Sequence, residues 1–192
     1  MKAVATSSLL DACEAVIAKD GPARAKMEDI ARAAGMAVGT VYNYFQDRDA
    51  LIAALRAERK RQLVGALELA LTDARDAKFE TRLRRFVGAM LEFAEARRPI
   101  FTLLLGSPET LAKVPAAAET GKELLALGER LTRMGVESGA LRADYAATHA
   151  TVLLSIVKGL TASALHANRN APLTDLVEPV IEIFSNGAGA RR

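Results

Sequence analysis

Apolar residues recur at every third or fourth position along almost the whole chain, and the strict alternation typical of a half-buried strand is nearly absent. This spacing predicts an all-α protein. Glycine, proline and capping residues divide the pattern into about nine helices, and Asp47 is the expected N-cap of a long one at 48–72. The other expected helices run from Ser7 or Ser8 to Gly21-Pro22, at 27–34, 38–45, 79–97 and 99–105, through Leu124 to Gly139, from the cap Asp144 to about 168, and at 174–185.

Composition excludes several classes of protein. With 51% hydrophobic residues among 192, the chain is long and apolar enough to bury a core, unlike a disordered protein. Its longest apolar stretches, such as 152–157, are far shorter than the roughly 18 residues of a membrane span. Asp11 and Glu14 interrupt the apolar start before it reaches the length of a signal peptide. A single cysteine, Cys13, allows no disulfide within one chain and is expected as a small buried hydrophobe. We therefore expect a cytoplasmic protein with no membrane partner.

Residues 21–51 carry the pattern that points most directly to a function. Two short helices follow each other there across a turn of three or four residues that contains Gly35, which is the helix-turn-helix arrangement. In this arrangement the first helix braces across the DNA backbone, and the second presents its N-terminal residues to base edges in the major groove. Gly35 can adopt the positive φ that such a turn needs. The spacing alone fits a turn in an ordinary small helical bundle equally well.

The residue types in this region sharpen the interpretation. The sequence MEDIARAAGMAVGTVYNYFQDRDALIAAL at 27–55 resembles the DNA-binding motif of the TetR family of bacterial transcriptional regulators. The segment GALRADYAATHA at 139–150 is similar to a turn in the helical C-terminal part of that family. The resemblance implies a three-helix DNA-binding domain at 1–47 and an effector-binding and dimerisation bundle at 48–192. It also implies a sequence-specific transcriptional regulator, namely a ligand-responsive repressor of double-stranded DNA operators.

The resemblance also assigns DNA contacts, residue by residue. The hydroxyl of Thr40 lies at a helix N-terminus, where free amide groups already favour an anion, and Arg48 can bind a phosphate bidentately. Tyr42 can donate its hydroxyl to a phosphate oxygen while its ring packs on the helix pair. The implied contacts are base edges for Val38 and Gly39, phosphates for Thr40 and Tyr42, and the DNA backbone for Tyr44 and Arg48.

The chain departs from the family pattern at two places. Ala37 stands where the family often has serine, and Ala25-Lys26 where threonines commonly cap the first helix of the motif, so two hydroxyl-to-phosphate bonds are absent. We expect Lys26 to reach a phosphate in their place. Asn43 is a further candidate, because a carboxamide can read an adenine edge.

The two C-terminal helices are expected to form a homodimer. Each carries a stripe of apolar and small residues, and two such stripes per protomer can pair with their symmetry mates as a four-helix bundle. A close crossing would explain Gly159, since glycine inside a helix costs about 1 kcal/mol. Pro179 indicates that the last helix starts later than Thr174 or kinks. The expected interface residues are His149, Val152, Ile156, Gly159 and Ser163 on one helix, and Val177, Val180, Ile181 and Phe184 on the other.

The helices between residues 48 and 168 are rich in flexible and aromatic apolar side chains, which predicts a cavity for a small apolar effector. An ordinary filled core would use the same residues at the same spacing, so both interpretations stay open. The candidate lining residues are Phe86, Met90, Phe93, Phe101, Leu104 and Met134.

Catalytic interpretations find no motif to support them. The chain has no His-Glu-x-x-His, no phosphate-cradling G-x-x-x-x-G-K and no G-x-S-x-G. His149 and His166 lie seventeen positions apart on one predicted helix, so they cannot share a ligand within one chain. We expect no enzyme activity, no metal and no cofactor. The alternatives to a regulator are an all-helical binding or structural bundle without DNA function, and a helical enzyme.

Overall fold

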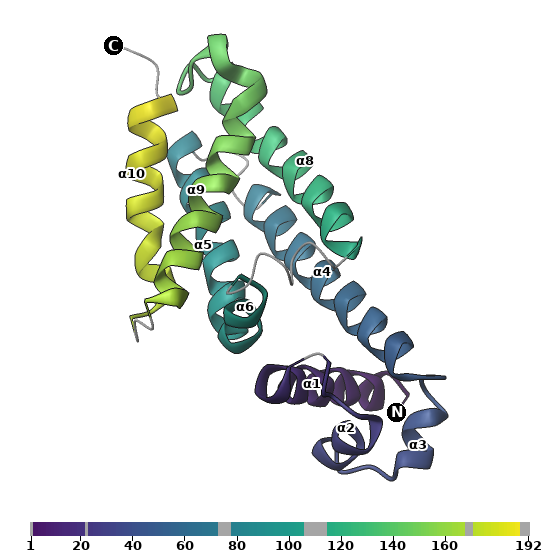
Figure 1. The fold of residues 1–192 in the computed structure, drawn as a ribbon. Helices are drawn as coiled ribbons and strands as arrows, with labels where there is room; N and C mark the ends of the chain where they lie inside the picture. The colour runs from purple at the N-terminus through teal and green to yellow at the C-terminus, as the bar shows by residue number, and fades with distance from the viewer. Residues whose placement is uncertain (1, 22, 73–77, 106–114, 168–170, 189–192) are drawn as a thin grey trace. The chain divides into compact units, whose positions relative to one another are not determined.

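The computed structural model describes residues 2–21, 23–72, 78–105, 115–167 and 171–188. The elements in these ranges are nine α-helices and two short 3-10 helices (Figure 1). The prediction of an all-α protein is therefore confirmed. Residues 109–114, which lie between the predicted helices at 99–105 and through Leu124, are outside the described residues.

The chain divides into two compact units, residues 1–61 and residues 62–192. The division falls inside α4 (Arg48–Thr72), the long helix that the sequence predicts at 48–72. The first turns of α4 thus belong to the N-terminal unit, where Arg59 pairs with Glu14 of α1. A functional boundary after residue 47 stays a prediction.

The first unit contains α1 (Lys2–Asp20), α2 (Met27–Ala33), α3 (Val38–Tyr42) and the beginning of α4. α1 packs against α2, and α2 packs against α3. Burial raises the pKa of the Cys13 thiol to about 11, so the predicted role of this residue as a small buried hydrophobe is confirmed. The buried apolar side chains of this unit that are larger than alanine are Leu9, Leu10, Cys13, Val16, Ile17, Met27, Ile30, Val41, Leu51, Ile52 and Leu55.

α1 begins earlier than the sequence predicts. It starts at Lys2, so Ser7 and Ser8 are exposed residues inside the helix and not its N-cap. Serine has a middling helix propensity and is tolerated at exposed helical positions, which is why a potential cap does not fix a helix start. The predicted end at Gly21 is confirmed: its φ is +82°, and its N–H donates to the carbonyl of Ile17 at 2.9 Å.

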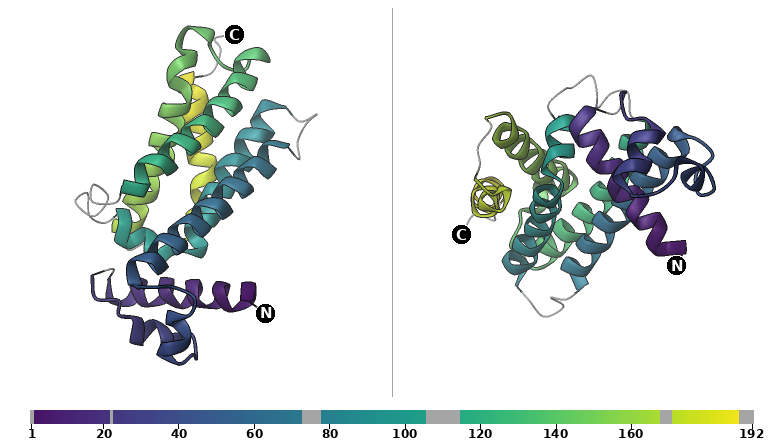
Figure 2. Two further views of the ribbon diagram at one scale, coloured as in Figure 1. Left: turned by 90° about the vertical axis from the view of Figure 1, so that its right-hand side faces the viewer. Right: turned by 90° about the horizontal axis from the view of Figure 1, so that it is seen from below.

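The second unit is a helical bundle. After the end of α4 it contains α5 (Phe79–Ala96), α6 (Arg98–Leu105), α8 (Pro115–Glu137), α9 (Ala146–His166) and α10 (Val177–Ala188). α9 packs against both α8 and α10, and α5 packs against α10 (Figure 2). The centre of its core consists of Leu67, Leu83, Phe86, Val87, Leu91, Leu131, Leu153, Leu173, Val180 and Phe184.

Short 3-10 helices precede two helices of the second unit. Asp144 does not cap α9 as predicted, because a 3-10 helix at Ala143–Tyr145 comes first and Asp144 pairs with Arg142 at 3.3 Å. α10 begins at Val177, after a 3-10 helix at Leu173–Leu176, which confirms the later start that Pro179 indicates. This late start places Pro179 in the first turn, where the missing N–H of proline costs no helical hydrogen bond.

Among the described residues, one segment, Ala143–His166, is long and apolar enough to span a membrane by length and composition, although the sequence predicts no span. The core helix of a protein that never meets a membrane passes the same test. Leu153, Val157 and Leu165 of α9 do lie in the core of the second unit. Only 33% of the segment's most apolar window is buried, however, which leaves an apolar helix with much of its surface open in one chain.

Candidate nucleic-acid interface

The turn between α2 and α3 is fixed by backbone hydrogen bonds. The N–H of Met36 donates to the carbonyl of Ala31 at 2.9 Å, and the N–H of Gly35 donates to that of Arg32 at 3.1 Å. These two bonds form a Schellman motif, which requires a left-handed residue after the helix. Gly35 supplies it with φ +66°, as the sequence predicts. The direction in which α3 leaves the turn therefore depends on a glycine at this position.

α3 is a short helix with one buried anchor. Val41 is completely buried, whereas Gly39, Thr40, Tyr42 and Asn43 are exposed, Tyr42 by 48% of its surface. The structure thus brings four predicted DNA contacts onto one open surface. Val38 and Tyr44 are half-buried at its ends.

The helical part of this segment is shorter than predicted. α3 ends at Tyr42, and residues 43–45 continue as a turn in which the N–H of Phe45 donates to the carbonyl of Val41 at 3.0 Å. Its N-cap is Ala37, which has no side-chain acceptor for the first amides of the helix. The N–H of Thr40 already donates to the carbonyl of Ala37 at 2.9 Å, so the helix start offers an anion at most the N–H groups of Val38 and Gly39.

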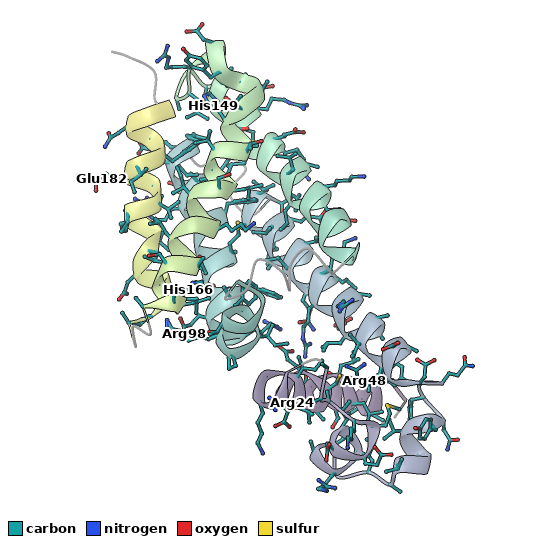
Figure 3. The ribbon with its side chains drawn as sticks, in the orientation of Figure 1. Arg24, Arg48, Arg98, His149, His166 and Glu182 are labelled. Atoms are coloured by element: carbon teal, nitrogen blue, oxygen red, sulfur yellow. The ribbon has the colours of Figure 1, made fainter. Side chains whose placement is uncertain are left out.

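Arg48 has a structural contact that sequence reasoning missed. Its Nε donates to the carbonyl of Ala25 at 2.6 Å, and its Nη1 lies 3.2 Å from a carboxylate oxygen of Asp49. The first bond ties the start of α4 to the segment before α2 (Figure 3). The predicted N-cap of α4, Asp47, is confirmed, because its carboxylate accepts the N–H of Ala50 at 2.7 Å. Arg48 therefore stabilises the packing of the first unit, in addition to its predicted contact with DNA.

An ion-pair cluster joins α1 to α4 in the same unit. Arg59 donates through Nη2 to Asp11 and through Nε to Glu14, both at 2.5 Å. Burial alone would lower the pKa of Arg59, but hydrogen bonds to the two carboxylates outweigh burial and raise it. Sequence reasoning missed this cluster, although acids spaced three apart on one face of α1 are a signal for a shared basic partner.

α2 contains an ion pair between two of its own residues. Asp29 pairs with Arg32 one turn later, at 2.9 Å. Lys26 lies at the N-cap position of α2, is exposed, and makes no capping hydrogen bond with its side chain. Its contact with a phosphate stays a prediction.

The predicted effector residues divide into core and half-buried positions. Phe86 is completely buried in the core, whereas Met90, Phe93 and Phe101 are partly buried side chains packed against it. Phe93 and Phe101 form an edge-to-face pair with ring centroids 6.2 Å apart. Met134 is also half-buried, and the side chain of Leu104 lies outside the described ones.

A guanidinium lies beside this aromatic pair, which sequence reasoning missed. Arg97, the C-cap of α5, places its guanidinium carbon 4.0 Å from the ring centroid of Phe93. It also donates to the side-chain oxygen of Gln62 at 2.7 Å. A positive charge thus meets an aromatic, partly open surface.

The predicted dimer residues also fall into two groups. His149, Val180, Ile181 and Phe184 are buried in the chain's own second unit, so they cannot form an exposed stripe. An amphipathic helix turns its most apolar face to its own core, and the sequence does not distinguish that face from an interface. The residues that remain open or half-open are Val152, Ile156, Gly159, Ser163 and Val177, and the exposed Ile183 of α10 joins them.

The chain has recognisable relatives. Residues 9–55 match the family described as bacterial regulatory proteins, tetR family. None of the curated proteins matches the chain. Among solved structures it is similar to the fatty acid degradation regulator FadR from Bacillus halodurans, at 23% identity and a TM-score of 0.83 over 97% of each chain.

Two further solved structures share the fold. The transcriptional regulator FadR from Bacillus subtilis, solved in complex with stearoyl-CoA, is 20% identical with a TM-score of 0.79, over 94% of this chain and 98% of the other. The ketosteroid transcriptional regulator KstR2 of Mycobacterium tuberculosis is 18% identical with a TM-score of 0.72, over 97% and 95% of the two chains.

Proposed function

We propose that this chain, whose residues 9–55 match the family described as bacterial regulatory proteins, tetR family, is a sequence-specific DNA-binding regulator that represses its target genes as a homodimer. The observation that carries the proposal is the surface of α3. A single buried residue, Val41, anchors a helix whose other central residues are exposed and can donate hydrogen bonds. A helix held in this way can enter a major groove without losing its packing.

The chemistry of each residue on and beside α3 determines which part of the DNA it can contact. Gly39 has no side chain, so the backbone can approach a base edge closely, and half-buried Val38 can make apolar contact there. Thr40 and Tyr42 present hydroxyl groups, which suit phosphate oxygens, and the amide of Asn43 suits an adenine. Lys26 adds a cation for a neighbouring phosphate.

The homodimer is supported by the open surface of α9 and α10. Val152 is 44% exposed and Ile183 is 52% exposed, while Ile156 is half-buried. Gly159 has no atom within 4 Å of where a Cβ would lie, so a second helix can pack closely there. In a two-fold dimer the two copies of α3 would meet successive major grooves roughly 34–36 Å apart, which requires a palindromic operator.

Binding to DNA upstream of the chain's own gene tests the proposal. Fluorescence anisotropy should detect a complex that a scrambled duplex does not form and that weakens steeply between 50 and 200 mM salt. Equal affinity for both duplexes would contradict sequence-specific binding.

An apolar effector in the second unit completes the proposal. Its support is the partly open set Met90, Phe93 and Phe101, and a fold shared with regulators of fatty acid degradation and of ketosteroids. Stearoyl-CoA is the natural first probe, because a relative of the same fold binds it. It should raise the melting temperature and release the operator, and Phe93→Ala should reduce both effects. If stearoyl-CoA, stearate and a ketosteroid all leave both quantities unchanged, the apolar set is a filled core.

A further inference from the structure

His149 is a buried imidazole in the second unit. It lies in the first turns of α9, with only 3% of its surface exposed (Figure 3). Its ring meets Phe184 of α10 edge to face, with centroids 6.3 Å apart. Neither ring nitrogen has a hydrogen-bond partner among the described residues. A neutral imidazole carries one N–H donor and one acceptor, and neither has a partner here. The ring is therefore held by apolar packing alone.

The charges near this ring oppose a second proton. The positive charge of Arg142, in the turn before α9, acts on the imidazole, and burial together with this charge lowers the pKa of His149. Arg142 is itself held by Asp144 at 3.3 Å and by the ring of Tyr145.

The acids and bases of the neighbouring helices do not compensate. On α10, Glu178 is bound by Arg84 at 2.7 Å, and Glu182 points away from α9 (Figure 3). Most charged residues on α5 and α8 in this region are exposed, namely Glu80, Arg84, Arg85, Glu129, Arg130, Arg133 and Glu137. The half-buried Arg82 of α5 is a further cation and donates to the sulfur of Met134 at 3.0 Å.

We propose that His149 is an acid-sensitive latch between α9 and α10: the closed packing holds only the neutral ring, and protonation releases α10 from α9. An imidazolium in this packing would be a buried charge against the ring of Phe184, with no hydrogen-bond partner among the described residues. The proton therefore binds when the ring is exposed, and each proton bound there favours the open arrangement.

The latch has a consequence that rests on the proposed function. α9 and α10 carry the open apolar surface that we assign to the homodimer, so release of α10 removes part of that surface. Acid that populates the open arrangement would then weaken the dimer and its hold on a palindromic operator, although His149 is buried within its own chain.

The chain offers a well-controlled test, because it contains only two histidines and both lie in the second unit. His166 is the matched control: it is exposed on the same helix, with Nδ1 2.7 Å from the carbonyl of Ala162. Hydrogen exchange of α10 amides, corrected for intrinsic rates, should rise about tenfold between pH 7.5 and pH 5.5, as protonation of an exposed imidazole with pKa near 6.5 dictates. Amides of α1 should keep the same protection at both pH values.

Variants decide whether His149 is the responsible group. His149→Leu and the polar, neutral His149→Gln should each abolish the tenfold change, and His166→Gln should retain it. Two variants are used because either one alone could perturb folding. Unchanged α10 exchange in the parent protein, a response that survives in both folded His149 variants, or one that is lost in His166→Gln would overturn the latch. Operator binding at pH 7.5 tests the proposed function separately, because the latch is closed there.

Discussion

At the scale of single residues, Tyr42 offers the sharpest test of DNA contact. Tyr42→Phe removes one exposed hydroxyl and keeps the ring, so operator binding should weaken by about 1 kcal/mol while the free energy of unfolding stays unchanged. Tyr145→Phe is the matched control, because Tyr145 is another exposed tyrosine and lies in the second unit. If anisotropy titrations gave both variants the parent affinity, the phosphate contact assigned to Tyr42 would be wrong.

Arg48 is expected to matter twice, for stability and for binding. Arg48→Ala removes the bond to the Ala25 carbonyl, which should lower the free energy of unfolding by about 1–2 kcal/mol in urea denaturation. If the guanidinium reaches a phosphate, the substitution should also weaken binding to all DNA sequences alike and reduce the slope of log affinity against log salt concentration by about one. Arg48→Lys keeps the charge without the planar fork, so a variant that is destabilised yet keeps its salt slope would separate the two roles.

At the scale of elements, α8 contains a glycine that its neighbours require. A Cβ on Gly135 would lie 2.7 Å from both Leu141 and Phe79, so Gly135→Ala should destabilise the protein by about 1–3 kcal/mol. Gly121 in the same helix has open space around it, and Gly121→Ala should be neutral or stabilising. Thermal unfolding of the two variants checks this contrast, and equal melting temperatures would contradict it.

The existence of the elements could be predicted from the sequence far better than their ends and faces. Leucine periodicity predicts α4 over its described length, and glycine predicts the left-handed turn at Gly35, because both signals are local. Helix starts at Ser7 or Ser8 and at Asp144 were wrong, since a capping residue only permits a start. The candidate dimer stripe failed at Phe184 for a different reason, because packing against α5 and α9 decides which face of α10 is buried.

At the scale of the whole molecule, the proposed homodimer predicts a change of mass. Ile156→Arg places a charge on the open surface of α9 and should give a monomer in light scattering at micromolar concentration, with loss of operator binding. Leu69→Arg is the control, because Leu69 is an exposed leucine on α4, a helix outside the proposed interface. A dimer that persists in Ile156→Arg, or a parent protein that is already monomeric, would refute the interface.

The boundary between the two units inside α4 determines where the DNA-binding part can be joined to the effector bundle of another regulator. A chimera joined after residue 47 would lack three residues that stabilise the first unit. They are the buried Leu51 and Leu55, and Arg59, the partner of two carboxylates on α1. A cut after residue 61 transplants all of these together with the motif. We therefore expect residues 1–61, joined in helical register to the effector bundle of another regulator, to carry their operator specificity to a new signal, and the shorter graft to be unstable.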